Sequence, residues 1–178
     1  MADKYLKLNT STGDIEQQSA LDTSSGAGSA GKIIAANSSG SLDVSFLPAG
    51  VGLQTITATA SESLSAGDSV NIFLNASTKS VRKANATDAT KPSMGFVLQS
   101  YTSSATATIY LSGKNASVPI GSFTTADLGK KVFLSTTAGG YTVTPPSTTG
   151  NLVQHLGYVV DVGSTVTVDY DEGLQIIV

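Results

Sequence analysis

Residues 69–74, SVNIFL, indicate the fold class of this chain, because apolar side chains occupy every second position. Val70, Ile72 and Leu74 share one face, and this period of two is the pattern of a β-strand with one buried face. The same alternation occurs in residues 54–60, QTITATA. Residues 93–99, SMGFVLQ, form a continuous apolar run that suits a strand buried on both faces. We therefore expect β-strands to dominate the fold.

Turn residues separate these strands from others along the chain, since Gly, Asn, Asp and Pro recur between the apolar segments, as in the turn expected at residues 113–115 (GKN). The further strands that we expect cover residues 4–8, 78–83, 105–111, 131–134, 141–144, 154–161, 164–170 and 174–178. Helical turns are expected only over residues 14–22 and 123–129, where Thr124 or Thr125 would cap the second. Many short strands predict an all-β fold, with residues 53–178 forming a β-barrel or β-sandwich body.

Composition excludes several classes of function. Charged residues make up 13% of the 178 residues, about half the usual share of ~25%. The net charge is −3 and no long basic run occurs, so no nucleic-acid partner is expected. The chain has no cysteine, which excludes disulfides and thiolate metal sites. No apolar run approaches the ~18–20 residues of a membrane span. We expect neither a membrane partner nor a cofactor.

Residues 31–50, GKIIAANSSGSLDVSFLPAG, carry apolar side chains in a segment too short and too polar to bury them itself. A Gly/Ser/Ala linker, residues 24–31, precedes this segment. We therefore interpret residues 1–50 as an extended amino-terminal assembly arm, whose apolar residues another surface would cover. The residues that we expect at this interface are Tyr5, Leu6, Leu8, Ile33, Ile34, Val44, Phe46 and Leu47.

The sequence of the body predicts an internal duplication. Gly67, Val70 and the run 95–97 (GFV) match Gly129, Val132 and the run 157–159 (GYV), with a constant offset of 62 (129 − 67 and 157 − 95). The proposed repeat units are residues 67–111 and 129–170. Two similar β-units would pack face to face, neither with enough apolar area to stand alone. The alternative is chance similarity within a composition rich in Thr and Val.

Candidates for chemistry are few, and we expect no enzyme. His155 is the only histidine; it could serve as a base or metal ligand, but it has no evident partners and suits an ordinary strand-edge position. Four carboxylates gather near the carboxyl end. They are Asp161, Asp169, Asp171 and Glu172. Their spacing does not match a calcium loop, so a solvated hairpin turn is the preferred interpretation. No catalytic or metal-binding residue is assigned.

Three segments resemble structural proteins of bacteriophage virions. Residues 31–48 are similar to a segment of phage fibre and head-decoration proteins, in which Gly-Lys-Ile and an Asn/Ser/Gly turn lead into Leu-Asp-x-Ser-Phe-Leu-Pro. Residues 126–160 resemble a phage β-module that contains DLGK-x-VFLS, a Gly-Gly turn and a Thr/Pro stretch. Residues 66–111 resemble small capsid-associated β-barrel proteins. These motifs cover most of the chain after Gly31.

The resemblance implies a non-enzymatic virion surface protein, often a homotrimer. The expected role is that of a capsid decoration (cement) or head-fibre protein, made in the bacterial cytoplasm and bound to the major capsid protein through the arm. A tail-fibre or receptor-binding component is the alternative. It would recognise host glycans through loops such as residues 100–104 or 136–144. A β-sandwich glycan depolymerase is a third possibility, which would need paired carboxylates beside one groove.

Overall fold

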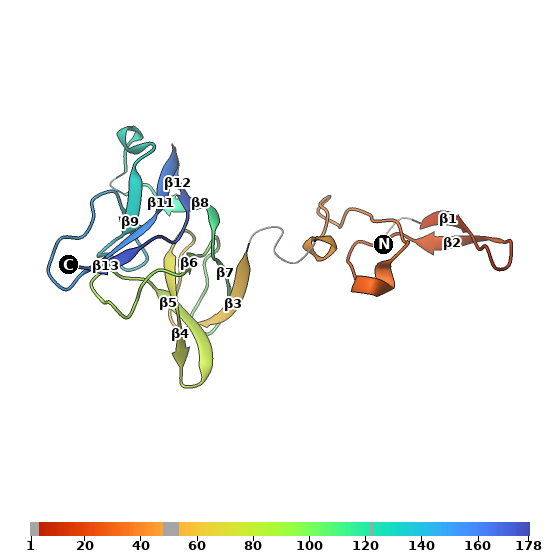
Figure 1. The fold of residues 1–178 in the computed structure, drawn as a ribbon, viewed down its shortest axis with the longest axis horizontal. Helices are drawn as coiled ribbons and strands as arrows, with labels where there is room; N and C mark the ends of the chain where they lie inside the picture. The colour runs from red at the N-terminus through yellow and green to blue at the C-terminus, as the bar shows by residue number, and fades with distance from the viewer. Residues whose placement is uncertain (1–3, 48–53, 122) are drawn as a thin grey trace. The chain divides into compact units, whose positions relative to one another are not determined.

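The computed structural model describes residues 4–47, 54–121 and 123–178. The chain divides into two compact units, residues 1–52 and residues 53–178 (Figure 1). Strands dominate the described residues and the helices are single 3₁₀ turns, so the expected all-β class is confirmed. None of these helices is long and apolar enough to cross a membrane.

The amino-terminal unit is built on a two-stranded hairpin, in which β1 (Lys4–Leu8) pairs antiparallel with β2 (Ile15–Ser19). Two 3₁₀ turns follow, η1 (Gly26–Ser29) and η2 (Val44–Phe46). The expected strand over residues 4–8 is confirmed. The helix expected over residues 14–22 is wrong. The Asn9 carboxamide accepts the amide of Ser11, which closes a turn and commits the next residues to a hairpin.

A closed barrel forms the first half of the larger unit. Its strands are β3 (Thr55–Ala60), β4 (Ser69–Asn75), β5 (Thr78–Lys83), β6 (Gly95–Phe96) and β7 (Thr106–Tyr110). Their order around the barrel is β3-β5-β4-β6-β7, and the parallel pair β3–β5 closes it. The long strand expected over residues 93–99 is shorter than predicted, although Phe96 and Val97 are buried as expected.

An open sheet forms the second half, in the order β10-β9-β11-β12-β8, with β13 also pairing with β11. Its strands are β8 (Gly113–Pro119), β9 (Lys131–Leu134), β10 (Tyr141–Thr142), β11 (Leu152–Val162), β12 (Thr165–Tyr170) and β13 (Gln175–Ile177). Between β8 and β9, η3 (Thr125–Asp127) is capped by Thr124 through a capping box, as expected. The body therefore combines a barrel with an open sheet.

Two local predictions in the second half are wrong. The Gly-Lys-Asn sequence at residues 113–115 was expected to be a turn, but it begins β8, whose Asn115 is buried. The residues after β12 do not form a hairpin turn. Asp171 N–H donates to Leu156 O, and Gly173 N–H donates to His155 O. β13 thus continues β12 along the same edge of β11 after a bulge.

The two halves share one strand order and one register. Val70 lies opposite Gly95, and Val132 lies opposite Gly157. Backbone bonds also recur at the offset of 62. The amide of residue 67 donates to the carbonyl of residue 97 at 2.8 Å, and that of residue 129 donates to residue 159 at 2.8 Å. The order β3-β7-β6-β4-β5 corresponds to β8-β12-β11-β9-β10. Duplication of the sequence stays a prediction, which this shared register supports.

A common core joins the halves. Phe96 of the barrel packs against Tyr170 of the open sheet, with ring centroids 5.3 Å apart. Gln154 is fully buried, and its carboxamide both accepts the Ser93 amide and donates to the Ser93 carbonyl, each at 2.7 Å. Buried polar groups are stable only when they are paired in this way. The contacts make residues 53–178 a single cooperative unit in our interpretation.

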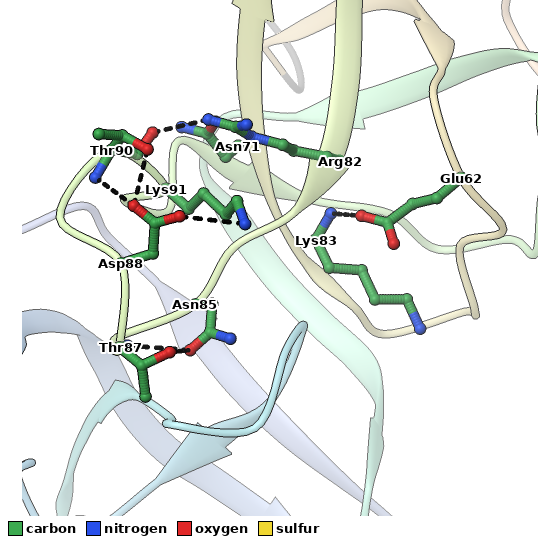
Figure 2. A network of polar contacts seen from close by, with 9 residues as sticks. All are labelled: Glu62, Asn71, Arg82, Lys83, Asn85, Thr87, Asp88, Thr90 and Lys91. Carbon is green, nitrogen blue, oxygen red and sulfur yellow. Dashed lines mark hydrogen bonds and ion pairs between the residues drawn. The ribbon is translucent and has the colours of Figure 1, made fainter.

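Side chains also order the long connection between β5 and β6 (Figure 2). Arg82 Nε donates to Asn71 Oδ1 at 2.9 Å, and the guanidinium also donates to the Thr90 carbonyl at 2.8 Å. Asp88 accepts both the amide and the hydroxyl of Thr90 and forms an ion pair with Lys91. These bonds hold the connection in one conformation beside the barrel strands.

Candidate assembly surfaces

The hairpin of the amino-terminal unit presents an apolar face to solvent. Leu6 and Leu8 of β1 are 72% and 56% exposed, and Ile15 of β2, which lies opposite Leu8, is 70% exposed. Side chains alternate between the faces of a strand, so these three residues share one face. Tyr5 lies on the other face, half-buried, and its hydroxyl donates to Gln18 Oε1 at 3.2 Å. Ile15 was not among the expected interface residues, because the segment IEQQS has little apolar pattern.

Ile33 and Ile34 lie beside Leu21 in a short parallel bridge. The Leu21 amide donates to the Ile33 carbonyl at 2.9 Å, and the Ala35 amide donates to the Leu21 carbonyl at 2.8 Å. Both isoleucine side chains remain about half exposed. The bridge therefore fixes the backbone of this segment without covering its apolar side chains.

The turn η2 holds the remaining expected interface residues. Phe46 is half-buried and Leu47 is 38% exposed. The side chain of Val44 and residues 48–50 of the expected arm lie outside the described part of the structure. The Ser45 amide donates to Asp43 Oδ1, and the bonds from Ser45 lower the pKa of the Asp43 carboxyl. Leu42, which precedes this turn, is also 53% exposed.

The amino-terminal unit has almost no core of its own. Among its described side chains, only Ala20 is buried, and it remains 9% exposed. A two-stranded hairpin alone is marginally stable in water, and burial of apolar area is the main favourable term in folding. The expected interface residues therefore share a unit whose fold does little to cover them.

The larger unit contains a cavity of about 360 Å³ beside β8 and β10. Its lining includes Val118, Pro119 and Phe123, the β9–β10 turn, and Tyr141 and Thr142 of β10. The segment of residues 67–69 runs beside it. Ser69 N–H donates to Gly139 O at 2.9 Å, and a Cβ added to Gly67 would overlap Ser117 O. Ligand pockets typically range from about 300 to 1,000 Å³.

Asp68 is the charged residue on the described wall of this cavity. Its Oδ2 atom accepts the Ser65 amide at 2.7 Å and forms an ion pair with Lys83 Nζ at 3.2 Å. Burial raises the pKa of the Asp68 carboxyl, while the Ser65 amide and the Lys83 charge act in the opposite direction. Oδ1 lies toward Gly139, where a Cβ would approach it to 2.8 Å. The cavity thus offers one carboxylate oxygen as an acceptor.

The residues considered for chemistry do not form a site. His155 packs edge-on against Phe133 and Tyr158, with ring centroids 5.9 and 5.2 Å away, and its Nε2 is buried without a hydrogen-bond partner among the described residues. Among the residues that the structure describes, no three His, Asp or Glu side chains lie close enough together to hold a metal ion. Of the two loops considered for glycans, residues 136–144 contribute residues 137–142 to the cavity lining, and residues 100–104 do not line it.

Comparisons with protein-family models, with curated proteins and with solved structures found no match for this chain. A functional proposal must therefore come from its own residues and geometry.

Proposed function

We propose that this chain is a structural protein of a phage virion. It decorates the capsid surface, as a cement or head-fibre protein, through residues 1–50. The body of residues 53–178 is displayed or stabilises the head. The protein catalyses no reaction and requires no cofactor. Its partners are the major capsid protein and further copies of itself, in a homotrimer assembled after synthesis in the bacterial cytoplasm.

One observation carries this proposal. Leu6, Leu8, Ile33, Ile34 and their neighbours stay exposed in a unit whose described side chains include a single buried residue. Scattered exposed apolar residues are ordinary, but a set concentrated in a segment without a core marks an interaction surface. The resemblance of residues 31–48 to phage decoration and fibre segments gives that surface its proposed partner.

Deletion of residues 1–30 tests the proposal. The shortened chain should keep the far-ultraviolet circular dichroism of the body and lose co-sedimentation with phage heads that lack the protein. A matched control removes exposed apolar side chains from the body instead, with Leu74→Ser at a site that is 73% exposed; this variant should bind as the full chain does. Undiminished binding by the deletion variant would contradict the proposed role of the arm.

Immunogold labelling of virions separates head from tail. Label at many positions over the head supports decoration of the capsid. Label confined to the tail would contradict our proposal and would favour the tail-fibre alternative.

A further inference from the structure

The barrel and the open sheet differ in one place, which we call the seam: β3 pairs with β5 in the barrel, and the corresponding strands of the open sheet, β8 and β10, do not pair within the described residues. In the barrel, Thr59 pairs with Ser80 and Ala60 pairs with Val81, and these parallel contacts between β3 and β5 close the ring of strands. The counterparts of β3 and β5 in the open sheet are β8 and β10. These two strands stand at opposite ends of the sheet order and do not pair within the described residues.

The registers locate this seam residue by residue. Val81 lies opposite Ile72, and Tyr141 lies opposite Leu134, which is 62 positions after Ile72. Tyr141 therefore stands in the place of Val81. Likewise Thr59 lies opposite Thr106, and Pro119 lies opposite Thr165. Since Thr165 corresponds to Thr106 along β12 and β7, Pro119 stands in the place of Thr59.

The cavity occupies this seam, because Pro119 and Tyr141 both line it. Proline has no backbone N–H and restricts the chain before it, so β8 ends at Pro119. In the barrel the chain instead continues past β3, and the Ser61 amide donates to the Val81 carbonyl at 2.9 Å. Among the described residues, β8 donates no corresponding hydrogen bond to the carbonyl of Tyr141.

The outer edge of β10 is therefore available for a further strand. The Ser135 amide donates to the Gly140 carbonyl at 3.1 Å. In an antiparallel ladder the next residue points its own N–H and C=O away from that partner. For Tyr141 this direction is away from β9. Extended segments of partner proteins commonly bind to free sheet edges of this kind.

Charge complementarity indicates which extended segment would bind at the edge of β10. Asp68 lines the cavity, and its Oδ2 atom is already paired with Lys83 and with the Ser65 amide. Its Oδ1 atom accepts none of the hydrogen bonds found among the described residues, so it remains an acceptor that suits an ammonium group. Within this chain, β1 is an extended strand with two lysines, Lys4 and Lys7, and no acidic residue. None of the ion pairs found among the described residues uses Lys7. One edge of β1 pairs with β2, and no other strand pairing is found for β1 in the described residues.

We propose that β1 of a second copy of this chain docks at the seam between β8 and β10, alongside β10, with Lys7 directed toward Asp68. The inference rests on the proposed function in taking the amino-terminal unit as the assembly element, and it identifies one partner of that unit as the body of another copy. The contact joins two different surfaces, so repetition of it generates a closed ring or a chain of copies.

Disulfide trapping tests the contact directly, because the chain contains no cysteine of its own. Thr142→Cys marks β10, and full-length copies with this change are mixed with copies carrying Tyr5→Cys or Leu6→Cys. The two β1 positions sample both faces of the strand. We expect rapid cross-linking of one of these pairs under mild oxidation. Leu74→Cys is the matched control, since Leu74 is 73% exposed and Leu6 is 72% exposed. Cross-linking no faster than this control for both pairs would overturn the proposal.

A charge reversal gives a second readout. Lys7→Glu should weaken self-association of the full chain by about tenfold or more, since it places like charges at the seam. Lys79→Glu makes the same change at an exposed site in β5 and should leave association unchanged. Sedimentation velocity measures both. Equal behaviour of the two variants, or an unmodified chain that remains an 18.0 kDa monomer, would contradict the inference.

The two proposals can fail separately. Copies that remain monomeric and still bind phage heads would overturn docking at the seam and leave capsid decoration intact. Copies that cross-link at the seam but never bind phage heads would support the docking and contradict capsid decoration.

Discussion

The hydroxyl groups of Ser93 and Tyr170 lie 2.8 Å apart in a hydrogen bond that joins the two halves of the body. Ser93 precedes β6 of the barrel, and Tyr170 ends β12 of the open sheet. Both residues are buried, and burial raises the pKa of the Tyr170 hydroxyl above its usual value. Tyr170 is therefore neutral at neutral pH, and its hydroxyl can donate to Ser93.

Removal of the Tyr170 hydroxyl should destabilise the whole body. Tyr170→Phe leaves the Ser93 hydroxyl without one of its buried partners, and we expect a loss of about 1–2 kcal/mol in the free energy of unfolding. Tyr158→Phe is the matched control, because Tyr158 is 45% exposed, and its effect should stay within about 0.5 kcal/mol. Urea denaturation measures both. A single transition is expected, since the core cluster of the open sheet also includes Phe96 of the barrel; separate transitions for the halves would contradict this.

Substitution of Gln154 should destabilise the body more than removal of the Tyr170 hydroxyl does. Gln154→Leu preserves much of the side-chain volume but leaves the amide and the carbonyl of Ser93 buried without partners. An unsatisfied buried group costs about 1–3 kcal/mol and the substitution leaves two of them, so we expect a total loss of about 2–6 kcal/mol. Val153→Leu is a suitable control at the adjacent, half-buried position of β11. Equal stabilities of the two variants in urea would show that the Gln154–Ser93 bonds contribute little.

The period of two along the chain was enough to predict the all-β class and most of the strands, because alternation is a local property of the sequence. β8 was missed because its first residues, Gly-Lys-Asn, are also typical of a turn. The side-chain nitrogen of the buried Asn115 donates to Gly67 O and to the Tyr141 hydroxyl. Those partners lie 48 and 26 residues away. β2 was predicted as helical because IEQQS has no alternation, and its pairing depends on the preceding turn.

Of the candidate surfaces, one could be predicted from the sequence and the other could not. Leu6, Leu8, Ile33 and Ile34 could be selected from the sequence because they are apolar residues in a polar segment, and the structure places all four in solvent. The cavity could not be predicted. It exists because β8 and β10 fail to pair where β3 and β5 succeed, and the absence of a long-range pairing leaves no local pattern.

Gly95 and Gly157 occupy matched positions in the two halves, so substitution of either by alanine should be strongly destabilising. A Cβ at Gly95 would lie 2.5 Å from Tyr110 O, and a Cβ at Gly157 would lie 1.9 Å from Asp169 O, where φ is also +122°. Gly95→Ala and Gly157→Ala should each cost at least about 3 kcal/mol, because the opposing backbone must move. Gly163→Ala is the control, since the nearest atom there is 3.9 Å away. Thermal unfolding measures all three. A mild effect at only one of the two matched sites would count against the equivalence.

In acid, the connection between β5 and β6 should lose local order at the turn of residues 88–90 and keep it at the turn of residues 85–87. Bonds from the hydroxyl and the amide of Thr90, and then from Lys91, lower the pKa of the Asp88 carboxyl to about 2 from 3.8. A lowered pKa stabilises the folded form above pH 3.8, and this stabilisation is lost as the pH falls toward 2. We expect the Thr90 amide to exchange faster, relative to the intrinsic rate, as the pH falls through this window.

Asn85 and Thr87 provide the internal control for this turn, because they repeat its geometry with an amide in place of the carboxylate. Asn85 Oδ1 accepts the amide and the hydroxyl of Thr87, each at 2.9 Å (Figure 2). The Asn85 side chain does not titrate, so protection of the Thr87 amide should change little between pH 4 and pH 2. In Asp88→Asn the Thr90 amide should also lose its pH dependence. Parallel loss of protection at Thr87 and Thr90 in the unmodified chain would indicate unfolding of the whole connection, and titration of Asp88 would then not be the cause.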